Sequence, residues 1–230
     1  PSIVFWSSGI LKEGPLFFVL GITLNVLNKI FTKRAYWQHY TLLIFCFLFL
    51  FHLKFYVGLL LVPATTGYLW IIKQKGPHPI IKTVLNFASY YAIAVIWHLY
   101  NWNWSLFTVL KWKRQDFLGL AKSMNAKSLI ETGNLEDTPT SFLQNLSMGL
   151  INAIIRPLPW EAYSIALLPN VIENCLIILF IFICVLYGKR KNFESIGYFF
   201  LMYALALLTI IGMVTPIMGS LVRYKIPAIP

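Results

Sequence analysis

Residues 40–72 read YTLLIFCFLFLFHLKFYVGLLLVPATTGYLWII and contain a single charged side chain, Lys54. A helix needs about 20 apolar residues to cross the roughly 30 Å of hydrocarbon in a bilayer. The first part, 40–53, is almost continuously apolar, and the second part, 56–72, holds Pro63, at which a kink is expected. This stretch therefore predicts two membrane-spanning helices that meet at a tight corner around Lys54.

The composition of the whole chain indicates the same class of protein. Of its 230 residues 58% are hydrophobic and only 12% are charged, whereas about 25% of the residues in an ordinary soluble domain are charged. With about half the usual share of charged residues, a chain of this size cannot cover a surface that faces water. The composition therefore excludes a cytosolic domain, a disordered chain and a disulfide-stapled secreted module, and it predicts an integral membrane protein of the all-α class.

Four further apolar segments complete a predicted bundle of about six transmembrane helices. They are residues 14–31, 83–104, 162–187 and 196–213. We expect residues 1–230 to form a single transmembrane domain. We also expect it to belong to a longer polytopic chain, because the sequence starts at Pro1 without a methionine and without a signal-peptide cleavage pattern.

Basic residues predict the orientation. The net charge is +11, but the basic residues cluster in short turns between apolar runs, which indicates topology signals and lipid head-group contacts rather than nucleic acid. Three such turns on one side hold Lys29, Lys33 and Arg34, then Lys73, Lys75 and Lys82, then Lys189, Arg190 and Lys191. Short basic loops stay in the cytoplasm. We therefore expect Lys33 and Arg190 to be cytoplasmic, and Lys127 and Arg223 to be periplasmic.

The connection 101–161 is the longest segment outside the predicted spans. Within it, residues 115–125 have helical character. Residues 141–155 favour an amphipathic or re-entrant helix, because apolar side chains recur every four residues. At about 60 residues the connection is close to the lower limit for an independent domain. We expect an external loop region that acts as a lid over the helices.

Two polar segments of the predicted outer face lie early in the chain. Trp6 opens the first segment, which ends in Lys12 and Glu13 directly before the first clear span. Lys54, at the corner described above, is the second. Each also has an anchoring interpretation: Lys12 and Glu13 as an ion pair with each other, and Lys54 as a lysine whose ammonium group reaches up to the membrane surface.

Two more polar segments lie late in the chain. In the first, prolines at 157 and 159 fix the backbone between Arg156 and Glu161. The planar guanidinium group of an arginine can donate two hydrogen bonds to a phosphate. Trp160 can stack on a sugar ring or lie at the membrane interface. The second segment carries Arg223 and Lys225 after the last span. The alternative for both segments is a basic head-group anchor, with Arg156 and Glu161 paired to each other.

Glu173 differs because it lies inside a predicted span. Ionisable groups at that depth usually face a cavity or a partner. The candidate partners are Arg223 and Lys54. The alternative to a functional acid in a polar groove is a structural acid paired between helices. The histidines and the three cysteines show no metal-binding or disulfide spacing. The chain has no GxSxG, P-loop or GxGxxG motif, so no metal or other cofactor is expected.

Four stretches together carry a family resemblance: residues 1–13, 54–59, 156–162 and 219–227. They resemble multi-pass inner-membrane proteins of bacterial surface-polysaccharide assembly, which are O-antigen-polymerase-like or related to the GT-C glycosyltransferases. GT-C enzymes carry a catalytic acid in their first external loop. This sequence has no Asp there, so in a GT-C enzyme the acid would lie in an N-terminal part that precedes Pro1, or Glu13 would substitute for it. The polymerase-like families rely on external arginines, which Arg156 and Arg223 match.

The resemblance implies glycosyl transfer from a polyprenyl-pyrophosphate-linked sugar at the outer face of the bacterial inner membrane, with membrane lipid and a lipid-linked glycan as partners. The implied catalytic residues are Arg156, Glu161, Arg223 and Glu13, and the implied substrate-binding residues are Trp6, Lys12, Lys54, Trp160, Glu173 and Lys225. Two other classes stay open. One is a lipid or glycan transporter, and the other is a non-catalytic subunit of a larger membrane assembly.

Overall fold

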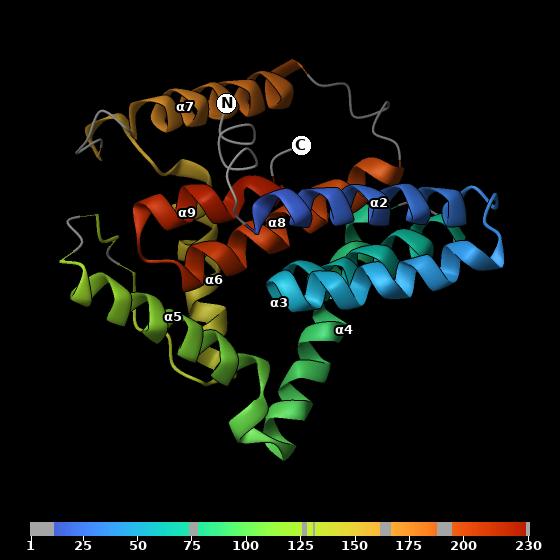
Figure 1. Ribbon diagram of the computed structural model, residues 1–230, viewed down its shortest axis with the longest axis horizontal. Helices are drawn as coiled ribbons and strands as arrows, with labels where there is room; N and C mark the ends of the chain where they lie inside the picture. The colour runs from blue at the N-terminus through green and yellow to red at the C-terminus, as the bar shows by residue number, and fades with distance from the viewer. Residues whose placement is uncertain are drawn as a thin grey trace.

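The computed structural model describes residues 12–73, 78–125, 128–130, 132–161, 167–187 and 195–228 and confirms the predicted all-α class (Figure 1). These residues form helices and one isolated β-bridge, between Leu129 and Ile217. The helices are α2 (Glu13–Phe31), α3 (Trp37–Lys73), α4 (Pro79–Tyr100), η1 (Trp102–Trp104), α5 (Leu106–Ser123), α6 (Pro139–Ile155), η2 (Pro159–Glu161), α7 (Leu168–Tyr187), α8 (Ser195–Val214), α9 (Met218–Lys225) and η5 (Ile226–Ala228).

The chain folds back on itself within α3. Lys54 has non-helical backbone angles, φ −148° and ψ 95°. A Cβ placed on Gly58 would lie 3.5 Å from the Cβ of Leu50, whereas residues eight apart in a straight α-helix are about 12 Å apart along its axis. The segments 37–53 and 55–73 are therefore two arms of a helical hairpin, and Lys54 occupies the corner that the sequence predicts.

Four of the described helices are long and apolar enough to cross a membrane: α2, α3, α4 and the part Ile196–Val214 of α8. The helix α7 is also apolar, although its predicted first residues, 162–166, lie outside the described part of the chain. Large apolar side chains are exposed along α4 and α7, among them Leu99, Phe180 and Phe182. Water would strongly disfavour such continuous apolar surfaces, so the fold is that of a membrane protein.

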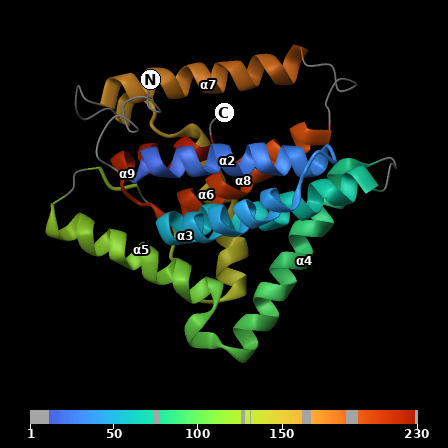
Figure 2. The same ribbon diagram turned by 45° about the vertical axis from the view of Figure 1, so that its right-hand side comes forward.

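The helix α8 lies at the centre of the molecule and packs against α3 and α6 (Figure 2). Its contact with α6 is the closest, because Gly149 of α6 and Gly212 of α8 face each other without side chains. Ala153 of α6 is buried at the same contact, since a Cβ on Gly212 would lie 3.1 Å from the Ala153 Cβ. The predicted lid, residues 101–161, thus includes a helix that packs into the core.

A polar contact ties α3 to α4 at the predicted proline kink. Asn86 of α4 is buried, and its Nδ2 donates to the carbonyl of Pro63 at 2.7 Å. The hydroxyl of Thr66 donates to Asn86 Oδ1 at 3.2 Å. Gly67 leaves room for the amide, since a Cβ there would lie 3.2 Å from Asn86 Nδ2. Neighbouring helices commonly satisfy the backbone around a proline in this way.

Asn86→Ala is expected to lower the free energy of unfolding by about 0.5–1.5 kcal/mol, the usual range for an interhelical hydrogen bond in a membrane protein. Thermal unfolding in detergent measures the change. Ser89→Ala is the matched control on the same helix, because the Ser89 hydroxyl donates only within α4, to the Asn86 carbonyl. Equal stability of the two variants would contradict an interhelical role for Asn86.

Candidate functional site

The short helix α9 contains the central residues of the candidate site. The way in which α8 ends sets the position of α9. Pro216 has no N–H to continue α8, and its carbonyl accepts from the Ile130 N–H at 2.7 Å. The Met218 N–H in turn donates to the Ser128 carbonyl at 3.1 Å. Buried Leu221 then anchors α9 on the core, so that it lies beside the start of α2 (Figure 1).

Two residues of α9 point to different neighbours. In an α-helix, side chains two positions apart lie about 200° apart around the axis. Arg223 therefore reaches α2, while Lys225 reaches the turn that follows α6. We call the residues bonded through these two side chains the α9 network; its members are Glu13, Lys54, Arg156, Glu161, Asn174, Arg223 and Lys225.

Glu13 forms the first half of the α9 network. Its side chain is fully buried. Arg223 donates hydrogen bonds to both carboxylate oxygens, from Nε to Oε1 at 2.7 Å and from Nη2 to Oε2 at 2.8 Å. The ammonium group of Lys54 lies 3.2 Å from Oε1 and 4.2 Å from the centre of the Tyr224 ring. Two cations around one carboxylate strongly favour its ionised form.

These contacts correct two of the anchoring interpretations. Lys54 is buried, so it does not extend to the membrane surface: its corner position turns the ammonium group inward to Glu13. The carboxylate of Glu13 is bound by Lys54 and Arg223 rather than by Lys12, which lies exposed at the start of α2. Neither pairing is local in sequence.

The turn 155–161, which we call the Arg156 turn, forms the second half of the network. Arg156 Nη1 pairs with Glu161 Oε1 at 3.1 Å, as one alternative predicted. The other oxygen of Glu161 accepts from the Leu158 N–H at 3.0 Å. Lys225 Nζ donates to the Arg156 carbonyl at 2.9 Å and to Asn174 Oδ1 at 2.6 Å. Trp160, in the middle of η2, is exposed.

Glu173 acts on a cation that the sequence did not single out for it. Arg223 and Lys54 bind Glu13, whereas Glu173 acts electrostatically on Lys225. Burial lowers the pKa of Lys225 to about 8, and the nearby charge of Glu173 opposes that shift. The network thus brings together six of the ten predicted site residues, Glu13, Lys54, Arg156, Glu161, Arg223 and Lys225, and Glu173 acts on it through Lys225.

The other three predicted residues are not among these. Trp6 lies outside the described residues, Lys12 is exposed, and Trp160 projects away from the bonded residues of its turn. In the part of the chain that the structure describes, no three His, Cys, Asp or Glu side chains gather closely enough to hold a metal ion. Arg156 and Arg223 lie in different halves of the network, which α9 joins.

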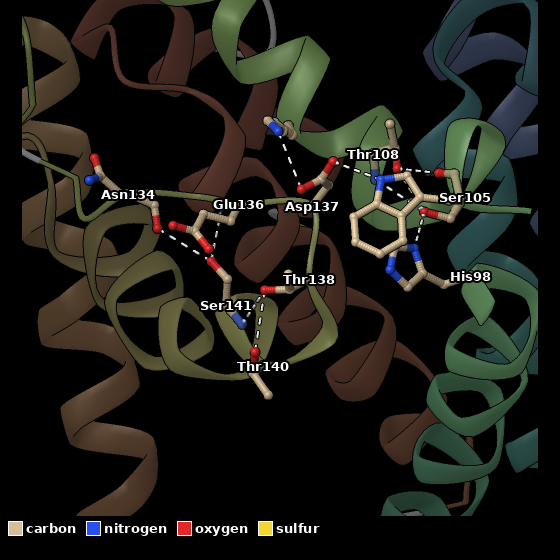
Figure 3. Close-up of polar contacts among 11 residues, drawn as sticks. His98, Ser105, Thr108, Asn134, Glu136, Asp137, Thr138, Thr140 and Ser141 are labelled. Atoms are coloured by element: carbon tan, nitrogen blue, oxygen red, sulfur yellow. Dashed lines mark hydrogen bonds and ion pairs between the residues drawn. The ribbon is translucent and has the colours of Figure 1, made fainter.

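A second polar cluster, which the sequence did not reveal, joins α4 to α5 (Figure 3). His98 Nδ1 lies 2.8 Å from the hydroxyl of Ser105, which in turn lies 2.9 Å from the Thr108 hydroxyl. Ser105 also accepts from the Thr108 N–H and so caps α5. Asp137 accepts from Trp102 Nε1 at 3.2 Å and pairs with Lys111 at 3.3 Å.

The position of this cluster indicates a structural role. His98 and Ser105 are both buried, and the hydroxyl of Ser105 is occupied by capping, which is the usual function of a serine before a helix. The signal that could have revealed the cluster is the spacing of Ser105 and Thr108 at the start of a helix. The cluster holds the corner at which the chain leaves α4 and returns along α5 (Figures 1 and 2).

Compared with protein-family models, curated proteins and solved structures, the chain matches none of them.

Proposed function

We propose that this membrane protein is a bacterial inner-membrane glycosyltransferase or O-antigen-polymerase-like enzyme that uses a polyprenyl-pyrophosphate-linked sugar at the outer face. One observation carries the proposal. Four polar segments that are far apart in the sequence are joined through one short helix, α9: Glu13 and Lys54 form a cluster with Arg223, and the Arg156 turn is bonded to Lys225. Membrane proteins retain such ionisable groups mainly at functional sites.

The charge of the network suits a pyrophosphate. Its cations are Lys54, Arg156, Arg223 and Lys225. Its anions are Glu13 and Glu161, and Glu173, which acts on Lys225 from outside the network, adds a third negative charge. Four positive charges against three negative charges leave one net positive charge. Arg156 and Arg223 remain 27% and 28% exposed, so both guanidinium groups can meet an anionic ligand from the outside.

In the proposed reaction the acceptor hydroxyl attacks the anomeric carbon of the donor sugar. The bond from that carbon to the pyrophosphate oxygen breaks, a carboxylate takes the hydroxyl proton, and the leaving pyrophosphate gains negative charge. Arginines that donate to this developing charge stabilise the transition state. The polyprenyl tail would lie in the lipid against exposed apolar helices such as α4 and α7.

Glu161 suits the role of proton acceptor better than Glu13. The side chain of Glu161 is 18% exposed, whereas Glu13 is fully buried and bound by two cations. A base must come within hydrogen-bond reach of the proton that it takes, and the buried Glu13 carboxylate already has both oxygens bound by cations. We therefore assign proton transfer to Glu161, and to Glu13 the orientation of Arg223.

A non-catalytic membrane subunit is the second candidate, and it too has a specific observation behind it. The carboxylates of Glu13 and Glu161 are both engaged in ion pairs within the protein. A network whose purpose is to join α2, α3, α6, α7 and α9 would show the same contacts. Abundance and activity measured on the same variants separate the two functions.

Arg156→Ala is expected to reduce surface-polysaccharide formation by about a hundred- to a thousandfold, the usual loss when one donor to a developing anion is removed. The amount of protein in the membrane should stay unchanged, because a partly exposed ion pair such as Arg156–Glu161 contributes about 0–1 kcal/mol. A glycan assay beside a membrane immunoblot, in cells that carry only the variant, measures both quantities.

Two further variants sharpen this test. Arg156→Lys should restore little of the glycan formation, since an ammonium group cannot donate the pair of parallel hydrogen bonds that a guanidinium group donates. Lys113→Ala is the matched control, because it removes an exposed cation paired with Asp116 on α5. Normal glycan with Arg156→Ala would remove Arg156 from the mechanism, and reduced abundance with unchanged activity per molecule would favour the non-catalytic subunit.

A further inference from the structure

We infer that Lys225 and Asn174 are positioning residues that hold the Arg156 turn in place, and that Lys225 does not itself bind the substrate. The part of this inference that concerns the orientation of Arg156 toward a pyrophosphate rests on the proposed function. The part that concerns the turn itself rests on geometry alone.

The contacts of Asn174 and Lys225 complete the end of α6. The last carbonyls of a helix lack partners within the helix. Asn174 Nδ2 donates to the carbonyl of Ile155 at 2.7 Å and to that of Pro157 at 3.4 Å, and Lys225 Nζ donates to the Arg156 carbonyl between them. A lysine at this end also interacts favourably with the helix dipole. Two side chains from two other helices thus bind three successive carbonyls.

Burial separates these two residues from the groups that can meet a ligand. Lys225 is 5% exposed and Asn174 is 3% exposed, whereas Arg156 and Glu161 are clearly more accessible. Lys225 and Asn174 are also bonded to each other at 2.6 Å. A substrate could reach Lys225 only after the turn had moved, so the effect of Lys225 on a ligand passes through Arg156.

The charge of Lys225 gives the turn a pH dependence with a definite sign. Glu173 on α7 acts on this charge, and Arg156 and Glu161 are the charged residues of the turn to which Lys225 is bonded; Arg223, on the same helix as Lys225, points to Glu13 instead. Its pKa is about 8 in the closed turn, against about 10.4 for an exposed lysine. Between these values the open turn binds more protons, so rising pH favours the closed turn. Closure should be about tenfold more favourable at pH 9 than at pH 7.

Amide hydrogen exchange of the purified protein in detergent tests the geometry without any activity. Lys225→Met and Asn174→Leu should each lower the protection of the segment 155–161 about tenfold or more, relative to intrinsic exchange rates, and leave α8 protected. Lys225→Arg should keep most of the protection. Lys122→Met, which removes an exposed cation at the end of α5, should change nothing. Unchanged protection in both test variants would overturn the inference.

The pH dependence is a second readout. In the unaltered protein, the protection of the segment 155–161 should rise about tenfold from pH 7 to pH 9 after correction for intrinsic exchange. In Lys225→Met it should stay flat, because the titrating group is gone. A rise of the same size in Lys225→Met would show that another group titrates, and would overturn the role of Lys225.

Binding of inorganic pyrophosphate connects the turn to the proposed function. Asn174→Leu changes no charge, so a weakening of pyrophosphate binding by about tenfold would show that the turn orients Arg156. A loosened turn with unchanged affinity would overturn the positioning role. If the unaltered protein and Arg156→Ala bind pyrophosphate equally weakly, the proposed function fails, while the exchange data still decide whether Lys225 and Asn174 hold the turn.

Discussion

Glu13→Ala is expected to lower the free energy of unfolding by about 3–5 kcal/mol, the usual cost of removing one partner from a buried ion pair. The reason is the position of Lys54. Its ammonium group is buried beside Glu13 and would lose its counter-charge, while Arg223 would lose both of its bonds to the carboxylate. Unfolding of the purified protein in detergent, followed by circular dichroism, measures the loss.

A double replacement and a neighbouring residue serve as controls for Glu13. Glu13→Leu combined with Lys54→Met removes both buried charges and should recover much of the stability, since a buried ion pair replaced by apolar groups is often neutral or stabilising. Lys12→Ala, one position away and exposed, should change stability by less than about 0.5 kcal/mol. A loss below about 1 kcal/mol with Glu13→Ala would show that the pair is not a structural requirement.

Gly212→Ala is expected to destabilise the protein by about 3 kcal/mol, at the upper end of the range for an overpacked core. A Cβ at Gly212 would overlap the backbone carbonyl of Gly149 and would lie 3.1 Å from the Cβ of Ala153. The clash is with backbone, so no side-chain rotation relieves it and α6 must move away from α8. Because the Arg156 turn directly follows α6, the same substitution should also disturb the candidate site.

Two other glycines test whether the effect is specific to this contact. A Cβ at Gly21 or at Gly219 would meet no atom within 4 Å. Gly21 lies in the middle of α2, so Gly21→Ala should stabilise that helix by about 0.5–1 kcal/mol. Thermal unfolding of the three alanine variants compares them directly. Similar midpoints for Gly212→Ala and Gly21→Ala would contradict a backbone-to-backbone contact between α6 and α8.

The membrane class, the main helices and the corner at Lys54 were all predictable from the sequence. Each depends on local composition: a run of about 20 apolar residues makes a spanning helix favourable whatever it packs against. A single charged residue between two such runs marks the place where one helix ends and the next begins. The functional interest of Glu13, Arg156 and Arg223 was also visible, because charged residues are rare in this chain and costly in a membrane.

The pairings could not be predicted in the same way. Glu13 and Arg223 are 210 positions apart, and hydropathy does not indicate which helices become neighbours. Lys12 was the nearest cation to Glu13 in the sequence, yet Lys54 and Arg223 bind its carboxylate. The role of Asn174 was hidden for a similar reason: its partners are backbone carbonyls of another helix end.

The sequence by itself determined that the chain forms apolar helices long enough to cross a membrane, because hydrophobic transfer energy is a property of each segment alone. It did not determine where they end: the span predicted at 83–104 is the helix Pro79–Tyr100, followed by the separate η1. Only the tertiary structure decided that α6 packs on α8, that Glu13 binds Lys54 and Arg223, and that Lys225 holds the Arg156 turn. Those contacts depend on the close approach that Gly149 and Gly212 permit and on the direction in which α9 leaves Pro216. The reason is that charge pairing and close packing act between surfaces, and the surfaces that meet exist only after the helices have assembled.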